Sequence, residues 1–577
     1  MSAVAHLSPA RWAEATSDLM AKALGEFAHE RLLEPREEPG GRYAVTSDDG
    51  TTTYRFAAER LALDHWAVDA GSITRRRGED KLPLDMLDLV LDLRETLGLE
   101  GERLGFYLEE ISSTLSASAY KLALPPLTAD ELAAADFQTI EARMTEGHPC
   151  FVANSGRLGF DADDYRRYAP EAAEPVQLVW VAAHRDWSTF SASADLDYAT
   201  LLAAELGRPT LERFACMMEA LGLDLADYHL IPAHPWQWST RLAVTFAADV
   251  ARRRLVCLGP GDDEYLAQQS IRTFFNASEP ARHYVKTALS VVNMGFVRGL
   301  SAAYMEGTPA INDWVAEVAA DSGLEVLRER AAVGYRSEHY EEAGGPYPQM
   351  FAALWRESPV PRLAPGERLA TMASLLHVDR DGRSLAAALI ERSGLPAEAW
   401  LSHYLDAYLR PLLHCFYAHD LVFMPHGENL ILVLEDDVPR RVLLKDIAEE
   451  VVLMDPRREL PPEVERIRAD VPDELKALSI LTDVVDCFFR FLNAILVRDG
   501  IDGFWEAVSN CIGDYQAAHP EYADRFERHD LFADSFALSC LNRLQLRDSR
   551  QMVDLADPAG SLQLIGTLDN PLRARVH

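Results

Sequence analysis

Residues 423–450, FMPHGENLILVLEDDVPRRVLLKDIAEE, contain two apolar runs separated by turn-forming residues. The runs 429–435 and 440–446 predict a β-hairpin, because Leu-rich and β-branched stretches favour strands and Asp and Pro favour turns. If Glu435 pairs with Arg440 around a four-residue loop, Asn429 pairs with Asp446. Directly opposed side chains lie about 4.5–5.5 Å apart on one face of a sheet. The hairpin excludes a wholly helical fold and gathers polar groups at its open end.

The rest of the chain predicts an α+β protein of several lobes. A length of 577 residues exceeds what one hydrophobic core organises. Residues 1–135 are expected to be mainly helical, with one strand–turn–strand stretch between the helices. Residues 136–330 mix strands and helices, and residues 331–577 return to helices around the hairpin.

Charge and composition restrict the partners and the compartment. The formal net charge of −35 argues against nucleic acid or an anionic membrane, because phosphate-bearing surfaces select basic proteins. The first residues lack a basic start and an apolar core, and no apolar run reaches the roughly 18 residues of a membrane span. The seven cysteines show no CxxC spacing, which excludes a cysteine zinc site and is typical of reduced thiols in the cytoplasm.

The open end of the hairpin carries groups that suit a metal and a phosphate. His426 could donate to a phosphate oxygen, while Asn429 and Asp446 could ligate Mg²⁺, which takes oxygen ligands. The same pair of residue types holds the metal in protein kinases, so a phosphotransferase is one interpretation. The competing interpretation is an Asn that caps a turn and a surface Asp at a strand end.

A second set of cations and hydroxyls precedes the hairpin. Within 29 residues of an acidic chain stand Ser270, Arg272, Thr273, Lys286 and Arg298. Arginine gives bidentate contacts to phosphate and lysine a mobile point charge, so this set could hold a triphosphate. Two strands with solvated basic ends would give the same spacing.

Two further motifs are less specific. Residues 147–160, GHPCFVANSGRLGF, predict a tight loop with Ser155 and Arg157 as phosphate ligands, although the GK[ST] of a P-loop is missing. Residues 231–238, IPAHPWQW, could build a rigid cleft wall around His234, and a buried structural corner explains them equally well. Neither GxSxG nor HExxH occurs, so hydrolase chemistry has no support.

In this order, GHP…R-G-F, HPWQ, S-I-R-T, K-T…R-G-L-S, HGEN and KD resemble the NRPS-independent siderophore (NIS) synthetases, the family of the aerobactin synthetases. The resemblance extends to the closing CLNRLQLRDSRQMVDLADPAGSL…NPL. It implies a cupped hand with a thumb (1–135), fingers (136–330) and a palm (331–577) that holds a kinase-like hairpin, in a cytoplasmic homodimer. It also implies that a carboxylate attacks ATP, and that an amine or hydroxyl then attacks the resulting acyl adenylate.

The resemblance also implies roles for individual residues. Expected catalytic groups are Lys286, Arg298 and His426. Expected ATP ligands are His148, Ser155, Arg157, Ser270, Arg272, Thr273, Lys286, Arg298, His426 and Asn429. Expected Mg²⁺ ligands are Glu428, Asn429 and Asp446, and expected substrate contacts are His234 and Gln237.

The chain departs from the family pattern at two places. Many relatives read GHPxHPxxKxR, whereas this chain has Phe-Val at 151–152 and Ser155 in place of Lys, so Arg157 must make that contact. Glu428 stands where relatives often have Gln, which adds a carboxylate beside the metal.

The substrate prediction depends on the subfamily. The first motif and the opening AHLSPARW…KALGEFAHERL are most similar to the desferrioxamine synthetases, which join N-hydroxy-N-succinylcadaverine units, a hydroxamate substrate, and close the ring. A citrate-derived acyl donor is the alternative within the family. A kinase is disfavoured because the catalytic-loop Asp is missing before Asn429, and a siderophore-binding protein because phosphate-type ligands are in excess.

Overall fold

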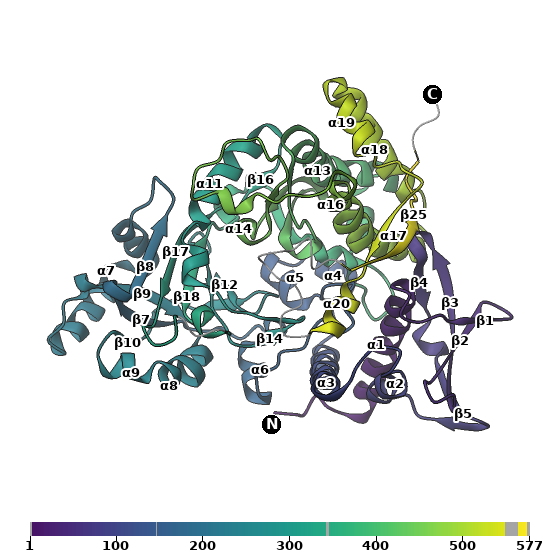
Figure 1. Ribbon diagram of the computed structural model, residues 1–577, viewed down its shortest axis with the longest axis horizontal. Helices are drawn as coiled ribbons and strands as arrows, with labels where there is room; N and C mark the ends of the chain where they lie inside the picture. Colours follow the sequence, from purple (N-terminus) through teal and green to yellow (C-terminus); the bar gives the residue numbers. More distant parts are fainter. Residues whose placement is uncertain (1–2, 146, 342–344, 549–562, 574–577) are drawn as a thin grey trace.

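Three regions of the chain surround a central junction in the computed structural model, which describes residues 3–145, 147–341, 345–548 and 563–573 (Figure 1). The N-terminal region lies at the lower right of this view, the middle region at the left, and the C-terminal region along the top. Each region has its own hydrophobic core. The mixed helix-and-sheet class that the sequence predicts is confirmed.

The N-terminal region packs helices against a twisted sheet with strand order β1-β2-β3-β5-β6, and β4 also pairs with β3. Its first helix begins at Pro9, because Ser8 caps it by accepting a hydrogen bond from the Arg11 amide and proline suits the first position. The sheet has six strands, whereas the sequence predicts one strand–turn–strand stretch among the helices. The elements are α1 (Pro9–His29), β1 (Arg36–Glu38), β2 (Arg42–Thr46), β3 (Thr52–Leu61), β4 (His65–Val68), β5 (Thr74–Arg77), β6 (Asp80–Leu82), α2 (Met86–Asp92) and α3 (Gly101–Ala123).

The middle region contains three sheets: β10-β7-β9, β11-β12-β13-β18-β17-β8, and the two-stranded sheet β14-β15. Short alternating runs of apolar and β-branched residues form these strands, as the sequence predicts. Its strands are β7 (Val179–His184), β8 (Ser188–Ala192), β9 (Tyr228–Ala233), β10 (Leu255–Pro260), β11 (Tyr265–Ala267), β12 (Thr273–Asn276), β13 (Tyr284–Thr287), β14 (Val292–Asn293), β15 (Phe296–Val297), β17 (Glu329–Tyr335) and β18 (Ala352–Arg356). Its helices are α4 (Ala129–Ala133), α5 (Phe137–Arg143), α6 (Ala162–Tyr168), α7 (Tyr198–Ala220), α8 (Ala243–Thr245), α9 (Ala247–Ala251), α10 (Ala302–Met305) and α11 (Thr308–Val318).

The C-terminal region packs the long helix α13 against a sheet of order β16-β22-β21-β19. Its strands are β16 (Glu325–Val326), β19 (Glu367–Thr371), β20 (Leu421–Val422), β21 (Leu430–Glu435), β22 (Val438–Leu444), β23 (Val452–Leu453), β24 (Ser535–Ser539) and β25 (Leu564–Asp569). Its helices are α12 (Leu385–Ser393), α13 (Ala397–His419), α14 (Ile447–Glu450), α15 (Asp473–Lys476), α16 (Leu478–Ile480), α17 (Arg490–Arg498), α18 (Phe504–Ala518), α19 (Ala523–Arg528) and α20 (Leu541–Arg547).

The chain crosses between the last two sheets more than once near residue 330. Strand β16 pairs in parallel with β22 of the C-terminal sheet. The next strands, β17 and β18, return to the sheet of β13 and β8, and β19 then joins β21. The expected division at 330 therefore falls inside an exchange of strands and not at the edge of a sheet.

Asn542 at the start of α20 connects the C-terminal region to the N-terminal one. Its side-chain amide donates to the Glu30 carboxylate at 2.8 Å and to the Cys150 carbonyl at 2.9 Å, and its oxygen accepts from the Val152 amide at 3.0 Å. The Asn542 side chain is completely buried. Part of the closing motif, residues 549–562, lies outside the described residues.

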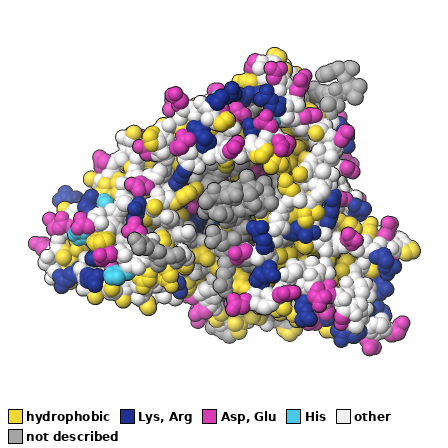
Figure 2. Space-filling view, in the orientation of Figure 1, with side chains coloured by type: hydrophobic (Ala, Val, Ile, Leu, Met, Phe, Trp, Pro, Cys, Tyr) yellow, Lys and Arg dark blue, Asp and Glu magenta, His cyan; other side chains and the backbone are white. Residues whose placement is uncertain are grey.

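Acidic and basic side chains alternate over the face shown in Figure 2, with apolar side chains between them. No extended basic surface is visible on this face, in keeping with the net charge of −35. None of the helices in the described ranges has the length and apolar character needed to span a bilayer.

Replacing Asn542 with Ala should destabilise the fold by on the order of 2–4 kcal/mol, because it leaves the Val152 amide and the Cys150 carbonyl buried without their partner. Chemical denaturation followed by circular dichroism measures this loss. Gln177→Ala, which removes an exposed amide, is the control and should change little. Equal stability of the two variants would contradict the role given to Asn542.

Candidate functional site

The hairpin that the sequence predicts is present as β21 and β22, but its register differs from the prediction. Leu430 pairs with Leu444, and the Lys445 amide donates to the Asn429 carbonyl at 3.0 Å, so Lys445 and not Asp446 lies opposite Asn429. The loop has two residues and not four: Asp436 and Asp437 both have positive φ, the geometry of a type I′ turn. The shorter loop alone would shift the pairing by two residues, and a bulge between the Val433 and Leu434 pairs takes back one of them.

Asp446 follows the hairpin in a left-handed conformation (φ 59°) and caps the short helix α14. Its carboxylate pairs with Lys286 Nζ at 2.8 Å and with Arg356 at 3.0 Å. Burial favours the protonated acid, but Lys286 and Arg356 hold the pKa of Asp446 well below its ordinary value. The side chain therefore remains an anion that joins the hairpin to the middle sheet.

Lys286 lies at the centre of that sheet, on β13 between β12 and β18. Besides Asp446, it pairs with Glu449 of α14 at 2.5 Å. Burial alone would lower the pKa of Lys286, but the two carboxylates Asp446 and Glu449 raise it above its usual range. The Lys286 side chain is 4% exposed, and its ammonium group is held between the carboxylates of Asp446 and Glu449.

Two arginines extend this buried cationic group. Arg272 approaches Glu449 at 3.5 Å and donates to the Gly299 carbonyl, and Arg298 donates to Asn293 Oδ1 at 2.6 Å. Burial and the neighbouring Arg272 lower the pKa of Arg298 to about 10, which still leaves it charged at neutral pH. The Nε atoms of both arginines are buried and have no hydrogen-bond partner among the described residues. Such donors suit a polyanionic ligand.

The backbone beside Arg272 is strained. Ile271 has a φ of 59°, which a β-branched residue rarely adopts. Ser270 donates to the Thr273 hydroxyl at 2.8 Å across this turn, and Thr273 pairs in register with Lys286. The turn thus brings the predicted residues Ser270, Arg272 and Thr273 next to Lys286.

Acidic groups that the sequence prediction missed complete the cluster. Glu449 and Glu450 lie on α14 directly after Asp446, and the Asn429 amide donates to the Glu450 carboxylate. Burial raises the pKa of Glu428 and of Glu450. A negative charge on these two buried carboxylates is unfavourable without a neighbouring cation. Together with the Asn429 side chain, they form a set of donors that fits a divalent cation such as Mg²⁺. The Glu-Glu pair of KDIAEE, shortly after Asp446, was the sequence feature that could have indicated these carboxylates.

His426 and His148 meet at the edge of the cluster, with ring centroids 5.4 Å apart. Both Nδ1 atoms are buried and lack a partner in the part of the chain that the structure describes. Burial lowers the pKa of His426 to about 4, so its imidazole is neutral at pH 7. Position 427, next to His426, requires glycine, because a Cβ on Gly427 would lie 2.5 Å from the Phe488 ring.

Arg157, His234 and Gln237 make hydrogen bonds outside the ion pairs of this cluster. Arg157 is buried and makes two hydrogen bonds to Glu171 at 2.7 and 2.9 Å. His234 is fully buried and accepts from the Trp236 amide at 3.0 Å, and Gln237 donates to the Met350 carbonyl at 2.9 Å. These contacts agree with the structural-corner interpretation of His234 and Gln237, and their predicted ligand roles stay predictions.

Two family models match different parts of the chain, and several relatives match nearly its whole length. Residues 136–377 match the sequence model of the IucA/IucC family, and residues 398–554 match the model described as a ferric iron reductase FhuF-like transporter. Putrebactin synthase of Shewanella sp. (strain MR-4) is 48% identical over 99% of this chain and 93% of its own length. Aerobactin synthase of Escherichia coli is 30% identical over 93% of this chain and 94% of its own length.

The chain belongs to the IucA/IucC family of siderophore synthetases. Its fold agrees with that of aerobactin synthetase IucC from a hypervirulent pathotype of Klebsiella pneumoniae, with a TM-score of 0.85, 29% identity, and coverage of 97% and 98% of the two chains. The petrobactin biosynthesis protein AsbB of Bacillus anthracis str. Sterne gives a TM-score of 0.87 over 99% and 97% of the chains at 22% identity, which shows the fold alone. The predicted family is confirmed.

A cavity of about 550 Å³ lies in this synthetase between α1, α3 and residues 377–380. Its walls carry both signs of charge: Glu14, Asp18, Lys22, Lys121, Arg143, Asp379 and Arg380. Ser155 and Asn154 also line it, and Asn154 donates to the carbonyl of His148 at 3.2 Å. One loop of the synthetase therefore touches the cavity at Ser155 and the charged cluster at His148.

Lys286→Met should destabilise the synthetase by about 3–5 kcal/mol near neutral pH, because Asp446 and Glu449 lose a buried counter-charge. Their folded-state pKa values lie below ordinary values of 3.8 and 4.5, so this stabilisation is complete above those values and disappears as the pH falls through the folded-state values. The difference between variant and wild type should therefore shrink below about pH 4.5.

Denaturant unfolding at pH 7 and pH 4 tests this prediction. Lys476→Met is the matched control, since Lys476 forms an ion pair with the exposed Asp473 at 2.9 Å. Equal losses for Lys286→Met and Lys476→Met would contradict the central role of Lys286.

Proposed function

We propose that this siderophore synthetase is an ATP-dependent, AMP-forming ligase that makes amide bonds through an acyl adenylate. A substrate carboxylate oxygen attacks the α-phosphorus of ATP, and the bond to pyrophosphate breaks. A substrate amine then attacks the acyl carbon, and the carbon–oxygen bond to AMP breaks while the amine loses a proton. The observation that carries this proposal is the buried junction at which Lys286, Arg272 and Arg298 face the acids of the hairpin.

The chain's own residues supply the binding and the electrostatics. Arg272 and Arg298 present buried guanidinium donors that can hold phosphate oxygens and stabilise charge on departing pyrophosphate. Neutral His426 can donate one hydrogen bond to the α-phosphate without adding charge. Glu428, Asn429 and Glu450 would hold Mg²⁺, which supplies further neutralisation of the triphosphate when bound.

Asp446, Ser155 and Arg157 have less direct parts in this proposal. Asp446 positions Lys286 through their ion pair at 2.8 Å, and its role as a Mg²⁺ ligand stays a prediction. Ser155 lies on the loop that connects the cavity to His148, so it can contact nucleotide or substrate. Arg157 acts by fixing that loop through its pair with Glu171.

The substrate that we propose is an N-hydroxy-N-succinyl diamine, with the cadaverine derivative and a desferrioxamine product first. Such a molecule has a carboxylate at one end and an amine at the other. The cavity offers cations, among them Lys22 and Arg143, and acids, among them Glu14, which suit the two ends. The name of the putrebactin synthase relative makes putrebactin the alternative product, and the citryl-spermidine ligase relative of Bacillus anthracis makes a citrate-derived donor the second alternative.

The architecture and setting complete the proposal. The N-terminal, middle and C-terminal regions correspond to the thumb, fingers and palm of a cupped hand, and the enzyme acts as a cytoplasmic homodimer. Support comes from the separate cores of the regions and from the likeness to IucC over 97% of the chain.

Incubation with ATP, Mg²⁺ and N-hydroxy-N-succinylcadaverine should yield AMP, pyrophosphate and a product that co-elutes with desferrioxamine. Chromatography with mass spectrometry measures the products, and putrebactin serves as a second standard. A parallel reaction with citrate and a diamine tests the other donor. EDTA should stop pyrophosphate release. Formation of ADP in place of AMP would identify a kinase and overturn the proposal, and turnover of citrate alone would overturn the substrate.

Arg298→Ala should lower kcat/KM for this reaction by about 10²–10³-fold, because the departing pyrophosphate loses a buried donor. Arg440→Ala is the matched control: Arg440 pairs with Glu435 at 3.1 Å on the exposed end of the same hairpin and should leave the rate unchanged. Activity of Arg298→Ala within a few-fold of wild type would remove Arg298 from the mechanism.

A further inference from the structure

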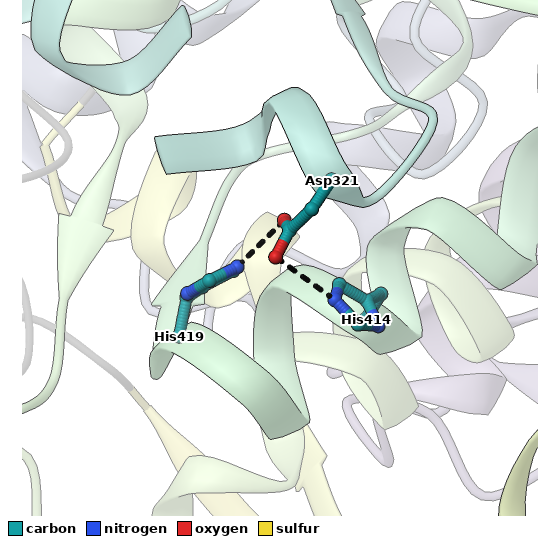
Figure 3. Close-up of side chains that lie close together, drawn as sticks. All are labelled: Asp321, His414 and His419. Atoms are coloured by element: carbon teal, nitrogen blue, oxygen red, sulfur yellow. Dashed lines mark hydrogen bonds and ion pairs between the residues drawn. The ribbon is translucent and has the colours of Figure 1, made fainter. Parts of the chain in front are cut away.

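Asp321, His414 and His419 converge at a place that the proposed chemistry does not use (Figure 3). Asp321 ends the short helix η7 (Ala319–Asp321), which directly follows α11, and the two histidines belong to the last turns of α13. Figure 3 shows the two imidazoles on either side of the Asp321 carboxylate, each with a nitrogen toward it. Side chains from two elements 93 residues apart in sequence thus share one point in space.

The distances within this group are those of a nearly formed metal site. His419 Nε2 lies 2.8 Å from Asp321 Oδ1, and His414 Nε2 lies 3.6 Å from Asp321 Oδ2. One ligand atom of each residue lies within 4.8 Å of the other two. A tetrahedral Zn²⁺ with bonds of about 2.0–2.1 Å needs ligand atoms roughly 3.3 Å apart, so small side-chain rotations suffice.

A contact with Tyr515 fixes the orientation of the His414 ring. The Tyr515 hydroxyl lies 3.2 Å from His414 Nδ1, so Nε2 is the nitrogen that faces Asp321. Metal-binding histidines commonly engage their second nitrogen in this way, which fixes the tautomer and the ring. A salt bridge between Asp321 and His419 alone would not require this arrangement of His414.

The exposure of the three side chains provides an entry path for an ion. The imidazoles of His414 and His419 are 14% and 17% exposed, while the Asp321 side chain is 60% exposed. Two histidines are thus held by the fold, and the carboxylate closes the site from the solvent side. Water or the neighbouring His519, whose ring centroid is 5.4 Å from that of His414, can fill the fourth position.

We propose that Asp321, His414 and His419 bind Zn²⁺ or a similar divalent transition-metal ion. Two imidazoles and one carboxylate suit Zn²⁺ and Co²⁺, whereas Mg²⁺ prefers a set of oxygens. The site is therefore chemically separate from the oxygen donors of Glu428, Asn429 and Glu450. Binding replaces the Asp321–His419 hydrogen bond and releases any proton held by the imidazoles to solvent.

The metal would clamp the end of α11 to the end of α13. Helix α11 packs against β17 and α14, and its Asn312 donates to the carboxylate of Glu329 at 3.0 Å. Helix α14 carries Glu449 and Glu450 of the charged cluster. The clamp thus secures the helix that supports α14, and its effect is on stability and on the placement of α14.

Titration of the untagged, metal-free chain with Co²⁺ in excess Mg²⁺ tests the site. We expect one Co²⁺ per chain, with the visible absorption bands of tetrahedral nitrogen and oxygen ligation, displaced by Zn²⁺. His419→Ala and Asp321→Asn should each weaken Co²⁺ binding at least tenfold. His403→Ala is the matched control, because His403 is exposed on the same helix α13.

Thermal unfolding keeps the test independent of absorption. Zn²⁺ should raise the melting temperature of wild type and of His403→Ala, and should not raise that of Asp321→Asn, whose altered side chain is exposed and compatible with folding. Circular dichroism establishes that each variant is folded. Absence of Co²⁺ bands, or equal Co²⁺ affinity in wild type and in folded Asp321→Asn, would overturn the proposal and leave a histidine–aspartate ion pair.

Discussion

The ion pair between Lys286 and Asp446 determines how the two halves of the site meet. Lys286 comes from the central strand of the middle sheet, and Asp446 from the end of the C-terminal hairpin, 160 residues later. Both side chains are buried, so each would be costly without the other. Arg356 and Glu449 share the same pair, which turns a single contact into a small network. The sheets can approach only in the one arrangement that satisfies all four charges.

The network also explains the electrostatic state of the site. Lys286 remains charged although it is buried, because its nearest neighbours are the carboxylates of Asp446 and Glu449. The histidine at the edge is neutral, and Glu428 and Glu450 lie where burial disfavours their negative charge. A site with charged donors fixed in advance does not need to reorganise when charge develops on a ligand. Burying these charges costs free energy of folding, and the burial of apolar side chains in the cores of the three regions offsets that cost.

Local features were predictable from the sequence, and the pairing of distant side chains was not. The hairpin, the Ser8 cap of α1 and the strands β7, β10 and β13 follow from patterns a few residues long. The register was missed for two reasons: two consecutive aspartates adopt positive φ, which shortens the loop from four residues to two, and a bulge then shifts the pairing back by one residue. An Asp-Asp turn is a weaker signal of that geometry than Asn-Gly.

The candidate site shows the same limit. The cations Arg272, Lys286 and Arg298 were found because basic side chains close in sequence are conspicuous in an acidic chain. Arg356 and Glu449 were missed, since their role appears only when β18 is placed beside β13 and α14 beside both. His234 was ambiguous in sequence, because a His-Pro corner looks the same in a cleft wall and in a core.

The contact between Glu30 and α20 has a consequence for the synthesis of the protein. Glu30 belongs to the end of the first helix, yet it accepts hydrogen bonds from the amides of Asn542 and Arg543 at 2.7 and 3.0 Å. A ribosome adding roughly 5–20 residues per second needs on the order of half a minute to two minutes to travel between these positions. During that time the C-terminal end of α1 lacks its partner. The Glu30 carboxylate, which is buried in the folded protein, stays exposed to water. The His148 loop contacts Asn542 through Cys150 and Val152, so this loop reaches its final contacts only after residue 542 has been synthesised.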